Sequence, residues 1–239
     1  MGVNRGPART VKSLFREGAH THLSEPTRRA ILALGWAAIE PLLALVEDER
    51  LTDSDDDALW YVQAHAVKLL FELHAVEAVE RLVHVHVTRN LQCEPSEFSH
   101  SLLEYLPQFG VHAVDPALAA YRRATHRNAR GRLAFVLAEC GVKDERIFEL
   151  LLERLEDDHV STPPNLAAYG DLRALPPLIA LLDRYIAEPT WTRYSTAVLL
   201  DLTDAIEALG GTLTLAQQRA VPLAEKWRER DELQSLDQN

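Results

Sequence analysis

Cysteine is nearly absent from the chain, since only Cys93 and Cys140 occur, far apart and outside any Cys-x-x-Cys pair. Two such residues offer neither a disulfide framework nor a zinc motif, and they suit a reducing compartment. No run approaches the ~18 consecutive apolar residues that a membrane span needs, and the first residues contain no apolar core of secretory length. We therefore expect a cytoplasmic protein with no membrane partner.

Aromatic residues and strand-like patterns are also scarce. Phe, Tyr and Trp make up 7% of the 239 residues, and alternating runs of Val, Ile and Thr are missing, whereas Ala and Leu are plentiful. This balance favours an all-helical chain. The hydrophobic fraction of 47% indicates a folded protein. The formal net charge of −11 repels phosphate backbones, which disfavours nucleic acid as a partner.

Sequence signals for catalysis are missing as well. The chain contains no Gly-x-Ser-x-Gly elbow and no Gly-rich phosphate loop. Cys140 falls on the predicted core side of a helix end, and Glu94 disfavours the thiolate form of Cys93. We therefore assign no catalytic residue and no cofactor.

The pattern that is present is a repeat of paired helices. Each unit has a residue at a tight turn, with an apolar residue four positions before it and usually a leucine about eight positions after it. The intervals between turn residues are 39, 36, 31, 29 and 40 residues, within the range of solenoid repeats. The six turn residues are Gly35, His74, Gly110, Gly141, Gly170 and Gly210. Glycine there permits the left-handed conformation that ends a helix.

Prolines and capping residues support this register. Pro41, Pro116 and Pro176 each lie six residues after a turn glycine, which predicts the first turn of the second helix. Asp171 is expected to cap such a helix, and Asp55–Asp57 to cap the helix that begins near Leu59.

We therefore predict an all-α fold, a right-handed α-α superhelix of about six antiparallel helix pairs. Residues 1–9 are expected to form a flexible tail, residues 10–232 one solenoid domain that opens with a short helix over Thr10–Gly18, and residues 233–239 a frayed end. The expected helices are 26–35, 37–50, 58–73, 75–89, 97–109, 112–125, 128–140, 143–157, 162–169, 172–187, 192–209 and 214–232.

The stretch Tyr169-Gly-Asp-Leu-Arg-Ala-Leu-Pro-Pro-Leu-Ile-Ala-Leu-Leu182 resembles the unit of HEAT-like repeats of the phycobilisome-lyase type, Leu-Gly-Asp-x-Arg-Ala-x-Pro-x-Leu-x-x-x-Leu. The units at Gly35 and Gly110 share its Gly, Pro and Leu but lack its Asp and Arg. The resemblance covers about residues 24–210. It implies the fold but no single function, because the family includes scaffolds, chromophore lyase subunits and some base-excision enzymes. Asp171 and Arg173 match structural positions of the motif.

One segment stands out as a candidate binding site. Residues 121–132 hold five arginines and no acid in an acidic chain. If the second helices line the concave face, as in HEAT-type solenoids, this segment contributes to the groove, where arginine can bind a carboxylate or phosphate. Alternatively, the arginines pair with acids such as Asp115, Glu139 or Glu153. The candidate partner-binding residues are Tyr121, Arg122, Arg123, His126, Arg127, Arg130, Arg132 and His84.

The ten histidines raise the question of a metal site. His84 and His86 are two residues apart on a predicted helix, so their side chains point in different directions. Glu80 and His84 could share an ion but supply only two ligands, whereas zinc needs at least three. We therefore predict no metal site.

Three functions remain open at this point. The first is a non-enzymatic scaffold or adaptor that binds a protein partner, with the acidic stretch Glu47–Asp57 suited to a basic one. The second is a HEAT-fold DNA-binding or base-excision repair enzyme, and the third a bilin lyase-like subunit. Nothing in the pattern of residues specifies the oligomeric state.

Overall fold

The computed structural model of the chain describes residues 6–17, 22–52, 57–89, 96–187 and 192–236. These residues form helices and no strand, and each helix packs against its neighbours along the chain. The fold is therefore all-α and solenoid-like, as predicted. The chain divides into two compact units, residues 1–142 (unit 1) and 143–239 (unit 2), which we describe separately.

Unit 1 contains ten α-helices and three short 3-10 helices among its described residues. These are α1 (Pro7–Val11), α2 (Leu14–Glu17), α3 (Glu25–Leu32), η1 (Gly35–Ala38), α4 (Ile39–Val46), α5 (Glu49–Thr52), α6 (Asp57–Glu72), η2 (Val76–Ala78), α7 (Val79–Thr88), α8 (Glu97–Tyr105), η3 (Pro107–Phe109), α9 (Val111–Arg123) and α10 (Arg127–Glu139).

Unit 2 contains α11 (Glu145–Leu155), α12 (Thr162–Tyr169), η4 (Leu172–Ala174), α13 (Leu175–Ala187), α14 (Arg193–Ala208) and α15 (Leu215–Leu236). Within it, α12 packs against α11 and α14, and α14 also packs against α13 and α15. The fourth predicted pair is divided between the units, because α10 belongs to unit 1 and α11 to unit 2.

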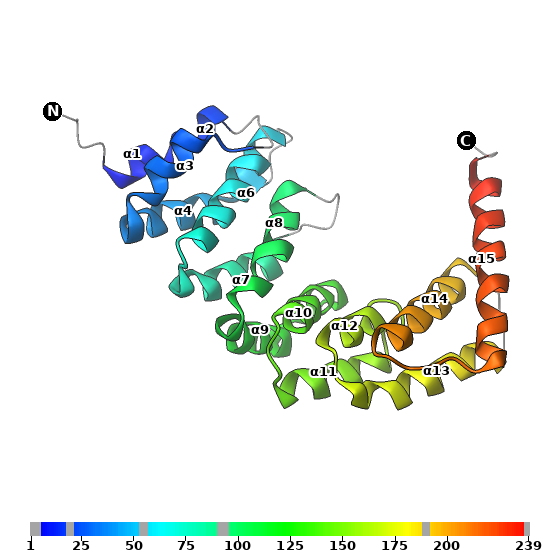
Figure 1. The fold of residues 1–239 in the computed structure, drawn as a ribbon. Helices are drawn as coiled ribbons and strands as arrows, with labels where there is room; N and C mark the ends of the chain where they lie inside the picture. Colours follow the sequence, from blue (N-terminus) through cyan, green and yellow to red (C-terminus); the bar gives the residue numbers. More distant parts are fainter. Residues whose placement is uncertain (1–5, 18–21, 53–56, 90–95, 188–191, 237–239) are drawn as a thin grey trace. The chain divides into compact units, whose positions relative to one another are not determined.

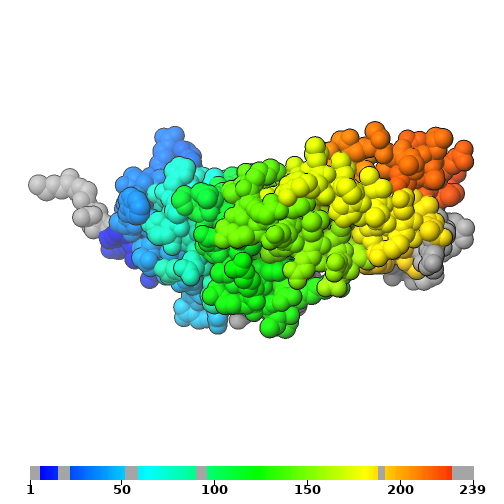
Figure 2. Space-filling view, turned by 90° about the horizontal axis from the view of Figure 1, so that it is seen from below, coloured from blue at the N-terminus to red at the C-terminus, as the bar shows by residue number. Residues whose placement is uncertain are grey.

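The helices of unit 1 form two layers (Figure 1). One layer holds the first helix of each pair, α3, α6, α8 and α10, and the other holds α4, α7 and α9. Across the layers α6 packs against α4, and within the layers α6 packs against α8 and α7 against α9. In the space-filling view (Figure 2) the blue, cyan and green segments of unit 1 follow one another in sequence order.

The positive φ that the predicted turns require is confirmed at all six turn residues. Among the described residues, positive φ values occur at these six positions and nowhere else, and they range from +52° at His74 to +78° at Gly210. The apolar residue four positions before each turn is fully buried in all six units: Ile31, Leu70, Leu106, Leu137, Leu166 and Ile206. The repeat is thus set by a backbone requirement and a core requirement at fixed spacing.

His74 is the one turn residue that is not glycine, and its φ of +52° carries a steric cost for any residue with a Cβ. We expect His74→Gly to raise the free energy of unfolding by roughly 0.5–1 kcal/mol, because glycine adopts this conformation without that cost. Urea denaturation of both proteins measures the difference. Gly35→Ala, at the equivalent turn with φ +55°, should shift stability in the opposite direction.

Several expected boundaries are wrong. The first helix begins at Pro7, inside the predicted tail, and the segment expected as one helix over Thr10–Gly18 contains the end of α1 and a separate α2. The last helix continues to Leu236, beyond the expected end at 232. Pairs one, two and five begin their second helix with a 3-10 turn, because the chain must reverse direction within the few residues after the left-handed turn.

Pro116 also differs from its prediction. Pro41 and Pro176 lie within the first turn of α4 and α13, where a missing N–H leaves no bond unmade. In the third pair the 3-10 turn precedes Gly110 and α9 starts directly at Val111, so Pro116 lies inside the helix. A proline there removes one hydrogen bond of the helix. Asp55, a predicted cap, lies outside the described residues.

Among the described residues, no single helix has both the length and the apolar composition to cross a membrane. The helices Glu25–Leu32 and Gly35–Val46, which meet at a bend of 111°, meet the criterion only when taken together.

Candidate functional site

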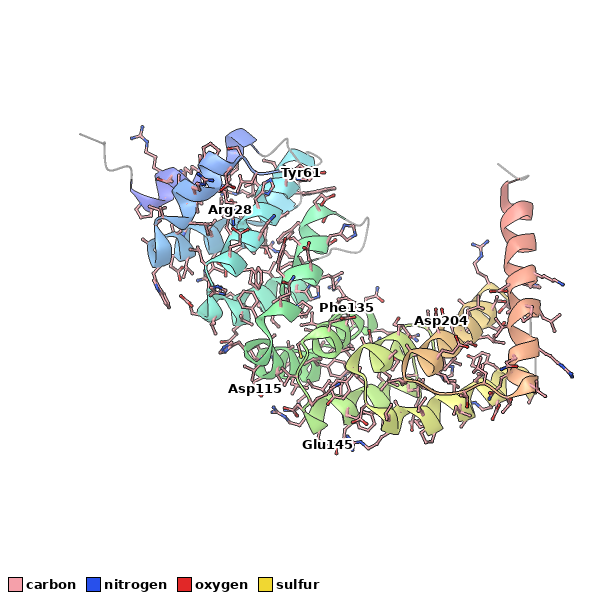
Figure 3. The ribbon with its side chains drawn as sticks, viewed as in Figure 1. Arg28, Tyr61, Asp115, Phe135, Glu145 and Asp204 are labelled. Carbon is pink, nitrogen blue, oxygen red and sulfur yellow. The ribbon has the colours of Figure 1, made fainter. Side chains whose placement is uncertain are left out.

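Unit 1 has a groove of about 440 Å³ on the layer formed by the first helices. The groove is lined by residues of α3, α6 and α8, together with His22 and Leu23 before α3. We call it the α6 groove, because α6 forms its floor. Figure 3 shows Tyr61 of α6 on the inner side of unit 1, whereas Asp115 of α9 lies on the opposite side.

One face of α6 supplies the floor of the groove. Tyr61, His65, Lys68 and Glu72 are spaced four, three and four residues apart, so they form a single row along the helix. The His65 side chain is buried and its ring lies 6.4 Å from the ring of Tyr61, whereas Lys68 is exposed. The row therefore offers an aromatic end and a charged end.

The α3 wall is tied to the floor by an ion pair. The Arg28 Nε donates to a carboxylate oxygen of Glu72 at 2.8 Å, and the same guanidinium lies 3.4 Å from Glu25. The hydrogen bond that Arg28 donates to Glu72 raises the pKa of Arg28. Arg29 in turn holds the pKa of Glu25 below its usual value. These charged side chains pair with one another. They therefore hold the walls of the groove in place and are less available to bind a ligand.

The α8 wall carries Glu97, His100, Ser101, Glu104 and Tyr105. Partial burial raises the pKa of the Tyr105 phenol to about 12, with a further contribution from its hydrogen bond to Glu104. The Tyr105 ring also packs on Phe71 of α6, with 5.3 Å between the ring centroids. Tyr105 therefore remains a neutral hydrogen-bonding group that fixes α8 to α6.

Three charged or titratable groups of the groove are uncommitted. Lys68, Glu97 and His100 are exposed, and in the part of the chain that the structure describes their side chains form no hydrogen bond or ion pair. The groove therefore carries a cation on its floor and a carboxylate on its α8 wall. Such a pair of separated charges can contact a ligand that carries both signs, as a peptide segment does.

The arginine segment does not line the α6 groove, and its role in binding a partner stays a prediction. The groove lies on the first helices, and Arg122 and Arg123 lie at the end of α9, a second helix. Both are exposed and form no ion pair with a described residue. Their charges complement the C-terminal end of α9.

Of the other arginines of the segment, Arg130 is exposed but contacts its own segment, and Arg132 is partly buried. The Arg130 Nε donates to the Ala124 carbonyl at 2.9 Å, and its guanidinium lies 5.6 Å from the centre of the Tyr121 ring. Arg132 is half-buried, and burial lowers the pKa of its guanidinium. Arg132 is therefore partly taken up by helix packing, whereas Arg122, Arg123 and Arg130 remain exposed. His126 and Arg127, at the start of α10, are exposed.

His84 and His86 point in different directions, as predicted from their spacing. His84 is exposed on α7, and His86 is fully buried. Neither ring nitrogen of His86 has a hydrogen-bond partner among the described residues. Desolvation and the neighbouring charge of Arg132 lower the pKa of His86 to about 3. Within the described ranges, no three His, Cys, Asp or Glu side chains come together as metal ligands.

Unit 2 shows what the Asp-x-Arg part of the motif does. Asp171 accepts a hydrogen bond from the Arg173 backbone N–H at 3.0 Å and caps η4. The Arg173 guanidinium binds Asp171 and Glu145, at 2.7 and 2.9 Å, and lies over the Phe148 ring. The motif residues therefore join η4 to α11, which is a structural role.

The same arrangement recurs at two further helix starts that the sequence reading missed. Asp144 accepts from the Arg146 backbone N–H at 2.9 Å, and Asp48 from that of Arg50 at 3.1 Å. The guanidinium of each arginine also binds the carboxylate of its own aspartate. The spacing Asp-x-Arg before an apolar stretch is the signal that could have predicted these caps.

Compared with known proteins, the chain matches no protein-family model, and no curated protein matches its sequence. The α6 groove and its uncommitted charges are therefore the observations from which we propose a function.

Proposed function

We propose that the protein is a non-enzymatic adaptor of the HEAT-like repeat type, acting in the cytoplasm, and that unit 1 binds an extended segment of a protein partner in the α6 groove. The observation that carries this proposal is the single row of Tyr61, His65, Lys68 and Glu72 along an open helix face. Parallel helices that each add such a row form the extended binding surfaces of repeat proteins.

The chemistry of the groove favours a peptide over a compact ligand. Lys68 can pair with a carboxylate of the partner, and Glu97 with a lysine or arginine, so one segment with both charges satisfies both. The aromatic end of the floor can hold an apolar side chain of the same segment. The Arg28–Glu72 pair keeps α3 and α6 at a fixed distance, so binding requires little reordering of the walls.

We expect the double variant Lys68→Glu with Glu97→Lys to recover at least tenfold less of the partner than the wild type. Both side chains are uncommitted and exposed, so the variant should fold normally. The measurement is an affinity pull-down from native lysate with the full chain, with the captured protein identified by mass spectrometry and then titrated in purified form.

The matched control is the double variant Lys226→Glu with Glu149→Lys, which reverses the same two charges on exposed positions of unit 2. It should capture the partner as the wild type does. Equal loss in both double variants would show that the interaction does not depend on the charges of the α6 groove in particular. Full recovery with the groove variant would rule out the groove as the binding site.

A further inference from the structure

A second surface of unit 1 carries large apolar side chains that are open to solvent. Trp36, Val76 and Val111 are 80%, 38% and 64% exposed. Each lies one or two residues after the left-handed turn residue of its helix pair, Gly35 for the first and Gly110 for the third. Trp36 and Val111 directly follow their turn residues, whereas in the second pair that position is Ala75, which is 1% exposed, and the exposed apolar residue is Val76, one position later. We call this set the turn edge.

Contacts between the pairs place these turns next to one another. Phe71, just before the second turn, packs on Phe109, just before the third, with 5.8 Å between ring centroids. Arg81, just after the second turn, binds Glu40, just after the first, at 2.9 Å. Neighbouring packed helices are about 8–10 Å apart, so we expect the turns that carry the three apolar side chains to follow one another at about that interval.

The charges beside the turn edge are mainly negative. Exposed carboxylates lie on the first turns of the second helices, at Glu40, Glu77, Glu80 and Asp115. The one arginine among them, Arg81, is engaged by Glu40 and by Glu47, at 2.9 and 2.6 Å. This border repels phosphate groups, which disfavours a nucleic acid or an anionic membrane, and it attracts lysine and arginine.

We propose that the turn edge binds a basic amphipathic helix of a protein partner. Seven residues of an α-helix span about 10.5 Å, which matches the interval between neighbouring turns. Apolar side chains at positions i, i+7 and i+14 of the partner helix therefore meet Trp36, Val76 and Val111 in order. Its lysines or arginines face the border carboxylates. Trp36, the largest and most exposed of the three, is the energetic centre.

The experiment uses a fluorescein-labelled synthetic helix of 18 residues, made of leucine and lysine with the leucines on one face. A peptide of the same pattern with glutamate in place of lysine serves as the charge control. Fluorescence anisotropy with the full chain at physiological salt gives both affinities. We expect the lysine peptide to bind at least tenfold more tightly, and Trp36→Ala to weaken its binding by at least tenfold.

Trp36→Ala removes a side chain that is mostly in solvent, so the variant should keep its circular dichroism spectrum and unfolding midpoint. Leu223→Ala, at a 56% exposed apolar position of unit 2, should bind the lysine peptide as the wild type does.

Equal affinity for the two peptides, or unchanged binding by Trp36→Ala, would overturn the proposal. So would binding of the full chain to phosphatidylcholine vesicles that Trp36→Ala abolishes, because that result assigns the turn edge to a lipid surface.

Discussion

Asp158→Ala is expected to lower the free energy of unfolding of unit 2 by about 3–5 kcal/mol, because it leaves a buried guanidinium without its counter-charge. Arg154 and Asp158 are both buried, and their side chains form a hydrogen-bonded ion pair. The second carboxylate oxygen of Asp158 accepts a hydrogen bond from the Ser161 backbone N–H at 3.1 Å. The substitution by alanine removes this hydrogen bond as well. Urea denaturation followed by circular dichroism measures the loss.

Asp157→Ala is the matched control, since the neighbouring aspartate is exposed and its removal should cost less than about 1 kcal/mol. A second arm replaces both partners, Arg154→Met with Asp158→Ala, and should recover much of the stability because no charge remains buried. If Asp158→Ala unfolds at the same urea concentration as Asp157→Ala, the buried pair does not hold α11 to the chain that follows it.

His86→Leu is expected to make the protein less sensitive to acid. The pKa of His86 is about 3 in the folded protein, whereas an unfolded histidine has a pKa near 6.5. Between these values the unfolded chain binds one more proton than the folded chain, so stability falls as the pH falls. The slope from this residue is about 1.4 kcal/mol per pH unit, which amounts to about 2 kcal/mol between pH 7 and pH 5.

The measurement is urea denaturation of wild type and His86→Leu at pH 7 and at pH 5. The difference in unfolding free energy between the two pH values should be about 2 kcal/mol smaller in the variant. His84→Leu, which removes an exposed histidine of the same helix, should keep the wild-type difference. Identical pH dependence in wild type and His86→Leu would mean that His86 becomes protonated without loss of the fold.

The core positions and turns of the fold could be predicted because both depend on local sequence. A left-handed turn favours glycine at one residue, and a buried helix face requires apolar residues at fixed spacing. Even His74 follows the rule. It adopts a positive φ because it occupies the turn position of the repeat, although a residue with a Cβ disfavours that conformation. The ends of the helices were predicted less well, because they depend on 3-10 turns and caps such as that of Asp144.

The α6 groove could not be predicted from the sequence, because a binding surface depends on which residues remain exposed after packing. The arginines of residues 121–132 form one run in the sequence, yet packing turns Arg130 toward the Ala124 carbonyl and leaves Arg132 half-buried beside His86. The α6 groove combines residues from 22 to 105 of the chain, and no single stretch contains its pattern.

Local patterns of residues were enough to predict an all-α solenoid-like chain, the positive φ at its six turn residues and the apolar residues that pack before each of them. Those features depend on φ preferences and on the helical period, which act over a few residues. Only the tertiary structure decided that the groove lies on the first helices, that His86 is buried without a hydrogen-bond partner among the described residues, and that Trp36 is exposed. These depend on contacts between helices far apart in the chain, where equivalent positions can be buried in one pair and open in the next.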